Sequence, residues 1–136
     1  MTAAVRYHTR SGNTKKLADA IAKEIHEDSL PVSSPLTADV DVLFLGASVY
    51  AGAADGEGLD FIRENSAHIG RIVVFGTSAM KKTARASVEK AAAECGVPVA
   101  EAEFSCRGSF LVLHRGHPDQ SDLDAAAEFA SKFIQA

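Results

Sequence analysis

Short apolar runs alternate along the chain with segments in which apolar residues recur at helical spacing. The apolar runs cover residues 3–7, 30–33, 41–48 ("DVLFLGAS"), 71–78 ("RIVVFGTS") and 99–106. Helical spacing predicts helices at about 13–27, 59–65 and 82–95, and a last helix after Pro118. Strands that alternate with helices are typical of an α/β protein with a parallel sheet.

The composition of each run predicts its place in the sheet. Runs 41–48 and 71–78 are apolar almost throughout, as expected of central parallel strands that helices cover on both faces. Run 30–33 contains Pro31, which cannot donate to a strand ladder and so belongs at an edge. Run 99–106 alternates, with alanines, Phe104 and Cys106 facing one way, which suits the other edge. The prediction is a five-stranded parallel sheet of order 2-1-3-4-5.

Three local features test this arrangement. The segment 34–40, between the second and third strands, is shorter than a parallel crossover usually needs. Arg6 stands in a central strand, so its side chain is expected to reach the sheet margin or an acidic partner. Ser121, with Asp124 three residues later, is the expected N-cap of the last helix.

The stretch "YHTRSGNTKKLADAI" begins at Tyr7, where the first apolar run stops and the first helical pattern starts. The hydroxyls, amide, guanidinium and glycine in between belong to Thr9, Arg10, Ser11, Gly12, Asn13 and Thr14. The first amides of the following helix have no acceptors within it, and the helix dipole is positive at that end. The loop is therefore predicted to bind an anion, at the switch point where ligands bind in such sheets.

Sequence motifs narrow the choice of anion. The chain has neither the GxxxxGK[ST] motif of P-loop proteins nor the GxGxxG dinucleotide fingerprint. A terminal phosphate held by hydroxyls and amides fits better. An ordinary capped turn between a strand and a helix is the alternative reading of the same residues.

Length and charge limit the protein class. A chain of 136 residues is expected to form a single domain, 1–136. With 14 basic and 18 acidic residues and no basic cluster, it is not expected to bind nucleic acid. No apolar run approaches the roughly 20 residues of a membrane span, so a soluble, cytoplasmic protein with reduced cysteines is expected. The histidines, including His114 and His117, are too scattered to predict a metal site.

Three motifs together resemble the flavodoxin family of small carriers of flavin mononucleotide (FMN): "TRSGNT", "DVLFLGASVYAG" and "VVFGTS". The resemblance covers essentially the whole chain and implies a flavodoxin-like three-layer sandwich. It implies that Thr9 through Thr14 bind the FMN phosphate. It also implies two loops around the isoalloxazine ring, one with Ser48, Val49, Tyr50, Ala51 and Gly52, the other with Thr77, Ser78 and Ala79. The chain departs from the family in having no tryptophan and only a mild net charge of −4.

Several residues near the predicted ring have two readings. Tyr50 could stack on a flavin or simply close the core. A flip of the Ala51-Gly52 peptide could accept a hydrogen bond from a half-reduced flavin, although surface turns use glycine in the same way. Glu57, like Asp55, would lower the flavin potential or only be solvated. His8 could approach the phosphate or be a hydrogen-bonded structural residue.

Two functions remain open from the sequence. One is a low-potential electron-transfer protein, which carries electrons between redox partner proteins and has no catalytic residues. For this chain a monomer is expected rather than a dimer. The other is a small FMN-dependent reductase of quinones or other acceptors, in which residues 108–117 shape a substrate site. A phosphorylated receiver domain is set aside, because Ala47 and Ser48 stand where the third strand would need an aspartate.

Overall fold

Five parallel strands form the central sheet of the computed structural model, in the order β2-β1-β3-β6-β7. The structure describes residues 1–8, 12–47, 49–50, 53–54, 56–78, 85–107 and 118–135, and of residues 49–50, 53–54, 77–78, 106–107 and 135 only the backbone. The strands are β1 (Ala3–Tyr7), β2 (Ser29–Pro31), β3 (Val42–Gly46), β6 (Ile72–Ser78) and β7 (Val99–Arg107). The predicted sheet and its 2-1-3-4-5 order are confirmed.

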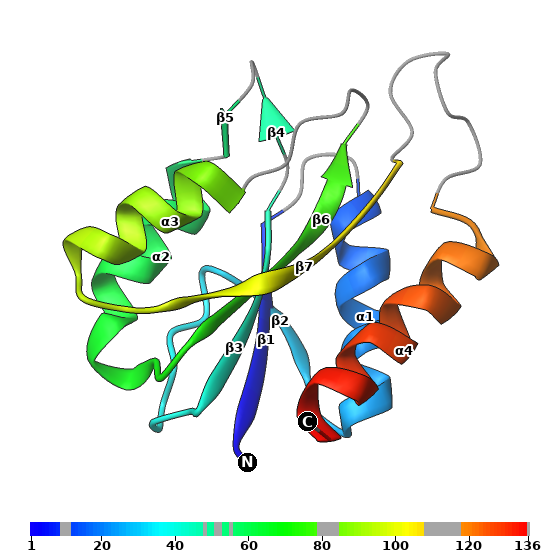
Figure 1. Ribbon diagram of the computed structural model, residues 1–136, viewed down its shortest axis with the longest axis horizontal. Helices are drawn as coiled ribbons and strands as arrows, with labels where there is room; N and C mark the ends of the chain where they lie inside the picture. Colours follow the sequence, from blue (N-terminus) through cyan, green and yellow to red (C-terminus); the bar gives the residue numbers. More distant parts are fainter. Residues whose placement is uncertain are drawn as a thin grey trace.

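Helices cover both faces of this sheet (Figure 1). They are α1 (Asn13–Ile25), α2 (Gly56–Asn65), the short 3-10 helix η1 (Ser66–His68), α3 (Arg85–Glu94) and α4 (Gln120–Gln135). In Figure 1, α1 and α4 lie on one side of the sheet and α2 and α3 on the other, which confirms the three-layer sandwich. Helix α1 ends at Ile25 because His26 adopts a left-handed conformation, with φ 59°.

The position of β3 between two helical layers explains why its residues are apolar at successive positions. Leu43 and Leu45 pack in one core cluster with side chains of α2 and α3, whereas Val42 and Phe44 pack in the other with side chains of α1 and α4. Successive side chains of a strand point to opposite faces, so a strand between two helical layers needs apolar residues throughout.

The predicted alternation of β7 is correct only in part. Ala100 and Phe104 pack against the α1 and α4 core, but Ala102, expected on the same face, is exposed. A register shift causes the difference: Ile72 pairs with Val99, whereas Val74 pairs with Glu103. Extra β7 residues between these pairs interrupt the alternation.

The buried Arg6 fastens the crossover from β2 to β3, which contains no helix. Its Nε donates to the Ser34 carbonyl at 2.9 Å, and Nη2 donates to the Pro35 carbonyl at 3.4 Å. Nη1 donates to the Val5 carbonyl at 3.0 Å, and burial lowers the pKa of the guanidinium. The side chain thus reaches the sheet margin, the first of its two expected destinations. Backbone carbonyls are its hydrogen-bond acceptors there.

Asn65 holds the same crossover from the other side. Its Oδ1 accepts a hydrogen bond from the Leu36 amide at 3.0 Å, and its Nδ2 donates to the Phe61 carbonyl at 3.0 Å. Leu36 is buried in the core beside α2. The short connection therefore has no crossover helix. The buried Leu36 and the hydrogen bonds of Arg6 and Asn65 hold it in place instead.

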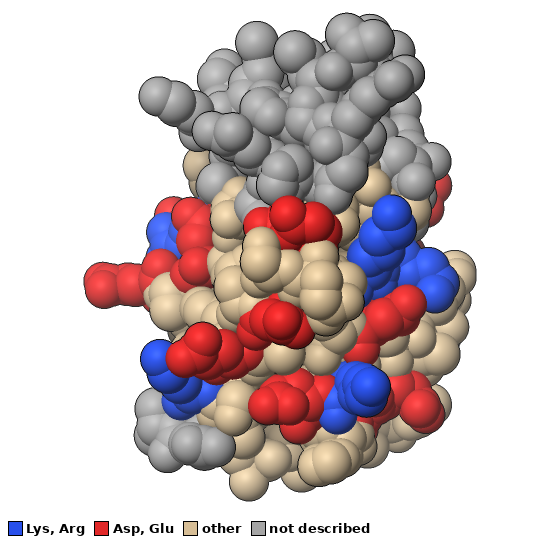
Figure 2. Space-filling model, turned by 90° about the vertical axis from the view of Figure 1, so that its right-hand side faces the viewer, with Lys and Arg blue, Asp and Glu red and all other residues tan. Residues whose placement is uncertain are grey.

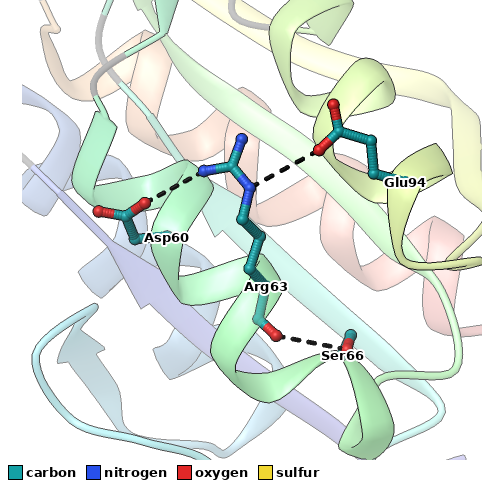
Figure 3. A network of polar contacts seen from close by, with 4 residues as sticks. All are labelled: Asp60, Arg63, Ser66 and Glu94. Carbon is teal, nitrogen blue, oxygen red and sulfur yellow. Dashed lines mark hydrogen bonds and ion pairs between the residues drawn. The ribbon is translucent and has the colours of Figure 1, made fainter.

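Helices α2 and α3 are joined at the surface by Arg63 (Figure 3). Its Nη1 lies 3.1 Å from Asp60 Oδ1, and its Nε lies 3.8 Å from Glu94 Oε2. The Arg63 carbonyl accepts a hydrogen bond from the Ser66 hydroxyl at 3.4 Å. Exposed pairs of this kind contribute about 0–1 kcal/mol, so the apolar contacts beneath them dominate.

The N-terminus of α4 corrects the predicted N-cap. The Asp122 amide donates to Asp119 Oδ1 at 3.0 Å, and the Asp119 amide donates to Asp122 Oδ2 at 2.9 Å. This reciprocal pair is a capping box, so Asp119 caps the helix. The prediction of Ser121 and Asp124 was wrong. Ser121 instead donates its hydroxyl to Asp119 Oδ1 at 2.7 Å.

This assignment predicts unequal effects of alanine substitutions. Asp119→Ala should lower the free energy of unfolding by about 1 kcal/mol, because a helix amide loses its acceptor. Asp124→Ala, the control at the rejected position, should change stability by less than about 0.5 kcal/mol. Urea unfolding of the two variants measures both values. Equal losses would contradict the observed cap.

Candidate functional site

The carboxyl ends of β1 and β3 define the candidate site. The two strands are neighbours, with Tyr7 paired to Gly46, but their onward connections lead to opposite faces of the sheet, through α1 and through α2. The His8 amide donates to the Gly46 carbonyl at 3.0 Å and extends the pairing by one residue. Ligands of doubly wound sheets bind at such a divergence.

The N-terminus of α1 lies at this point and has the properties of an anion site. Its N-cap is Gly12, with φ 89°, and this residue has no side chain that could cap the helix. The described first turn contains no acidic side chain, so the positive end of the dipole is not neutralised from within the turn. Asn13 and Thr14, the first two helical residues, are buried polar side chains.

Gly12 also leaves room at this terminus. A β-carbon built on Gly12 would meet no heavy atom of the described residues within 4 Å, its chain neighbours aside, and the positive φ disfavours residues other than glycine. The contrast with α4 is direct, because there the Asp119 carboxylate accepts from a first-turn amide. Helix α1 thus begins at a residue that has no side chain to fill the space in front of its first turn.

A contact between His8 and Glu57 spans the divergence. The Nδ1 atom of His8, just past β1, lies 3.2 Å from Oε2 of Glu57, in the first turn of α2. His8 therefore has a polar partner in α2, as its structural reading expects, and its approach to a phosphate stays a prediction. Glu57 is exposed but is not simply solvated. The pair joins the residue before the predicted phosphate loop to the helix that follows the first predicted ring loop.

A short antiparallel hairpin follows β3. Strand β4 (Val49–Tyr50) pairs with β5 (Ala53–Ala54), with Tyr50 opposite Ala53. The sequence did not reveal it, because two-residue strands show no periodicity. This hairpin contains part of the predicted ring loop, and it separates β3 from α2.

Gly76 allows β6 to approach the end of β3 closely. A β-carbon on Gly76 would lie 2.3 Å from the Ala47 carbonyl oxygen, a distance that excludes any larger residue without movement of the backbone. Gly76 immediately precedes Thr77, the first residue of the second predicted ring loop. The sequence signal is a lone glycine inside an apolar strand, which often marks close backbone approach.

The structure describes the predicted binding residues unevenly. Gly12, Asn13 and Thr14 lie together at the start of α1. For Val49, Tyr50, Thr77 and Ser78 the backbone alone is described, in strands β4 and β6. Thr9, Arg10, Ser11, Ser48, Ala51, Gly52 and Ala79 lie outside the described residues. Their predicted contacts with a cofactor remain predictions.

Acidic and basic side chains are interspersed on the face that carries α1 and α4 (Figure 2). Lys15 pairs with Asp19 at 2.9 Å on α1, and Lys132 pairs with Glu128 at 2.9 Å on α4. The described part of this face has no continuous basic field of the kind that binds nucleic acid.

Two further classes of feature are absent from the described ranges. Within these ranges, no three His, Cys, Asp or Glu side chains are grouped so that they could hold a metal ion. Among the same residues, no helix has the length and apolar character needed to cross a membrane.

The fold and the helix terminus at its switch point define a flavodoxin-like α/β protein. The family model of the flavodoxin domain matches residues 4–111, and the chain therefore belongs to the flavodoxin family. The comparison with curated proteins gave no match.

Solved structures share the fold at low sequence identity. An archaeal flavodoxin aligns at TM-score 0.78 and 17% identity, over 99% of this chain and 97% of its own. Oxidised flavodoxin 2 from Bacillus cereus aligns at 0.69 and 19%, over 99% of each chain. A flavoprotein in complex with FMN from Lactobacillus acidophilus NCFM aligns at 0.59 and 16%, over 77% of this chain and 92% of its own.

Proposed function

We propose that this chain is a single-domain, FMN-binding electron-transfer protein. The observation that carries the proposal is the N-terminus of α1, where the N-cap residue Gly12 has a positive φ and no side chain to occupy the space in front of the helix. Terminal phosphates bind at such ends, because amides and the helix dipole both favour an anion. The FMN complex of the related Lactobacillus acidophilus flavoprotein supports the choice of cofactor.

The residues of the α1 terminus fit a phosphate group. Gly12 leaves room for its oxygens, and the turn from Thr9 to Thr14 brings hydroxyl, amide and guanidinium donors. The loops with Ser48–Gly52 and Thr77–Ala79 would hold the isoalloxazine ring beside the hairpin. FMN when bound supplies one-electron and two-electron redox chemistry. The chain would bind it, orient it and leave an edge of the ring accessible.

The likeness to solved flavodoxins favours an electron carrier over a reductase. The chain aligns over 97% and 99% of two solved structures that are flavodoxins, and this likeness supports the carrier. A carrier needs redox partner proteins as donors and acceptors. We infer a cytoplasmic monomer, and a low potential supported by the Glu57 carboxylate near the proposed ring.

The test is an absorbance spectrum of the purified protein with FMN, followed by stepwise anaerobic reduction. The carrier should be yellow and should take up electrons in two separate one-electron steps. A single two-electron step, together with turnover of a quinone, would favour the reductase. Protein that remains colourless after addition of FMN would contradict both functions.

A further inference from the structure

We propose that Gly46 is a positioning residue for the phosphate-binding turn, a role that rests on the proposed binding of FMN. Gly46 ends β3 and pairs with Tyr7 on one side and Phe75 on the other. It precedes the residues predicted to contact the cofactor, so the sequence motifs alone gave it no role.

Because Gly46 has no side chain, the buried side chains of Phe75 and Thr14 can pack directly against the strand at this position. A β-carbon there would lie 2.6 Å from Cε2 and Cζ of Phe75 and 2.8 Å from Cγ2 of Thr14. Contacts this short do not occur in folded proteins, so an alanine would force one neighbour to move. Both neighbours are fully buried.

The two neighbours differ in what their movement would disturb. The Phe75 ring packs in the core with side chains such as Val5, Leu17 and Phe44, where little free space is available. Thr14 is the second residue of α1 and is stiff about its first side-chain torsion, because it is β-branched. Displacement of its methyl group would therefore shift the first helical turn.

The position of the Thr14 methyl group fixes the other branch of the side chain. With Cγ2 held against Gly46, the position of the hydroxyl on the same β-carbon is fixed as well. The same contact sets the distance between the first amides of α1 and the end of β3. Binding sites require their donors within about 0.5 Å of the productive position. The contact between Thr14 and Gly46 therefore controls how well a phosphate is bound.

The experiment measures dissociation constants for FMN and for riboflavin, which lacks the phosphate, by quenching of flavin fluorescence. Gly46→Ala should raise the FMN constant by about tenfold or more, while the riboflavin constant changes by less than about threefold. The matched control is Gly70→Ala. There the added β-carbon would lie 2.7 Å from the Asp41 carbonyl oxygen, at the opposite end of the sheet. This control should lower stability without changing the preference for FMN.

A second variant isolates the Thr14 contact. Thr14→Ser removes Cγ2 and keeps the hydroxyl, which gives space to the added methyl group and to the Phe75 ring. Gly46→Ala combined with Thr14→Ser should therefore bind FMN within about threefold of Thr14→Ser alone. This comparison holds even where Gly46→Ala by itself does not fold.

The outcomes separate this inference from the proposed function. Wild-type protein that binds neither flavin would overturn both. Tight FMN binding that Gly46→Ala leaves unchanged would overturn the inference alone. An equal loss of FMN and riboflavin, without rescue by Thr14→Ser, would show that Gly46 serves only the stability of the core.

Discussion

Gly12→Val is expected to weaken FMN binding by about 100-fold or more, which corresponds to about 3 kcal/mol. The β-carbon and methyl groups would enter the open space at the N-terminus of α1, where the phosphate is proposed to lie. They would also disfavour the left-handed conformation of the N-cap, φ 89°. Fluorescence quenching measures the FMN affinity, and circular dichroism checks that the helices are retained.

Gly96→Val is the matched control for backbone strain. Gly96 also has a positive φ of 73°, and a β-carbon at this position would meet no heavy atom within 4 Å in the part of the chain that the structure describes, its chain neighbours aside. It follows the C-terminal end of α3, away from the switch point. The variant should lose stability to a similar extent and keep FMN affinity. If both variants lost FMN equally, or if Gly12→Val bound it normally, the assignment of the α1 terminus would be wrong.

Arg6→Met is expected to lower the free energy of unfolding by about 3 kcal/mol. Methionine fills much of the same volume, but the Ser34 and Pro35 carbonyls would lose their guanidinium donors. Hydrogen bonds from charged groups contribute about 1.5–3 kcal/mol each, and the recovered desolvation of the charge offsets part of their loss. Urea unfolding measures the difference.

Arg63→Met is the control for this substitution. It removes the same charged group, but from an exposed network between α2 and α3 (Figure 3). The expected loss is below about 1 kcal/mol. Similar losses in the two variants would show that the helix-free crossover does not depend on Arg6.

The sequence predicted the sheet well because burial leaves a direct trace in composition. Strand β3 is apolar at every position between two helical layers, and Pro31 marked an edge strand. The α1 terminus was found for a similar local reason, since a glycine and small polar residues stand between a strand and a helix. These signals depend on residues close together in the chain.

Features decided by tertiary contacts were missed or misplaced. The segment "PDQSDLD" offers capping boxes in more than one register, and the choice of Asp119 over Ser121 depends on where α4 packs. The acceptors of Arg6 are backbone carbonyls, which leave no mark in a sequence. The pair of His8 with Glu57 joins residues that lie 49 positions apart in the sequence, and no local pattern predicts it.

The central claim is that the turn into α1 binds the terminal phosphate of FMN. It is tested most directly by the affinities of the wild-type protein for FMN and riboflavin, which differ only in that group. If the claim is correct, FMN binds about 100-fold more tightly or better, and the advantage falls in high phosphate buffer. Equal affinities for the two flavins would contradict it.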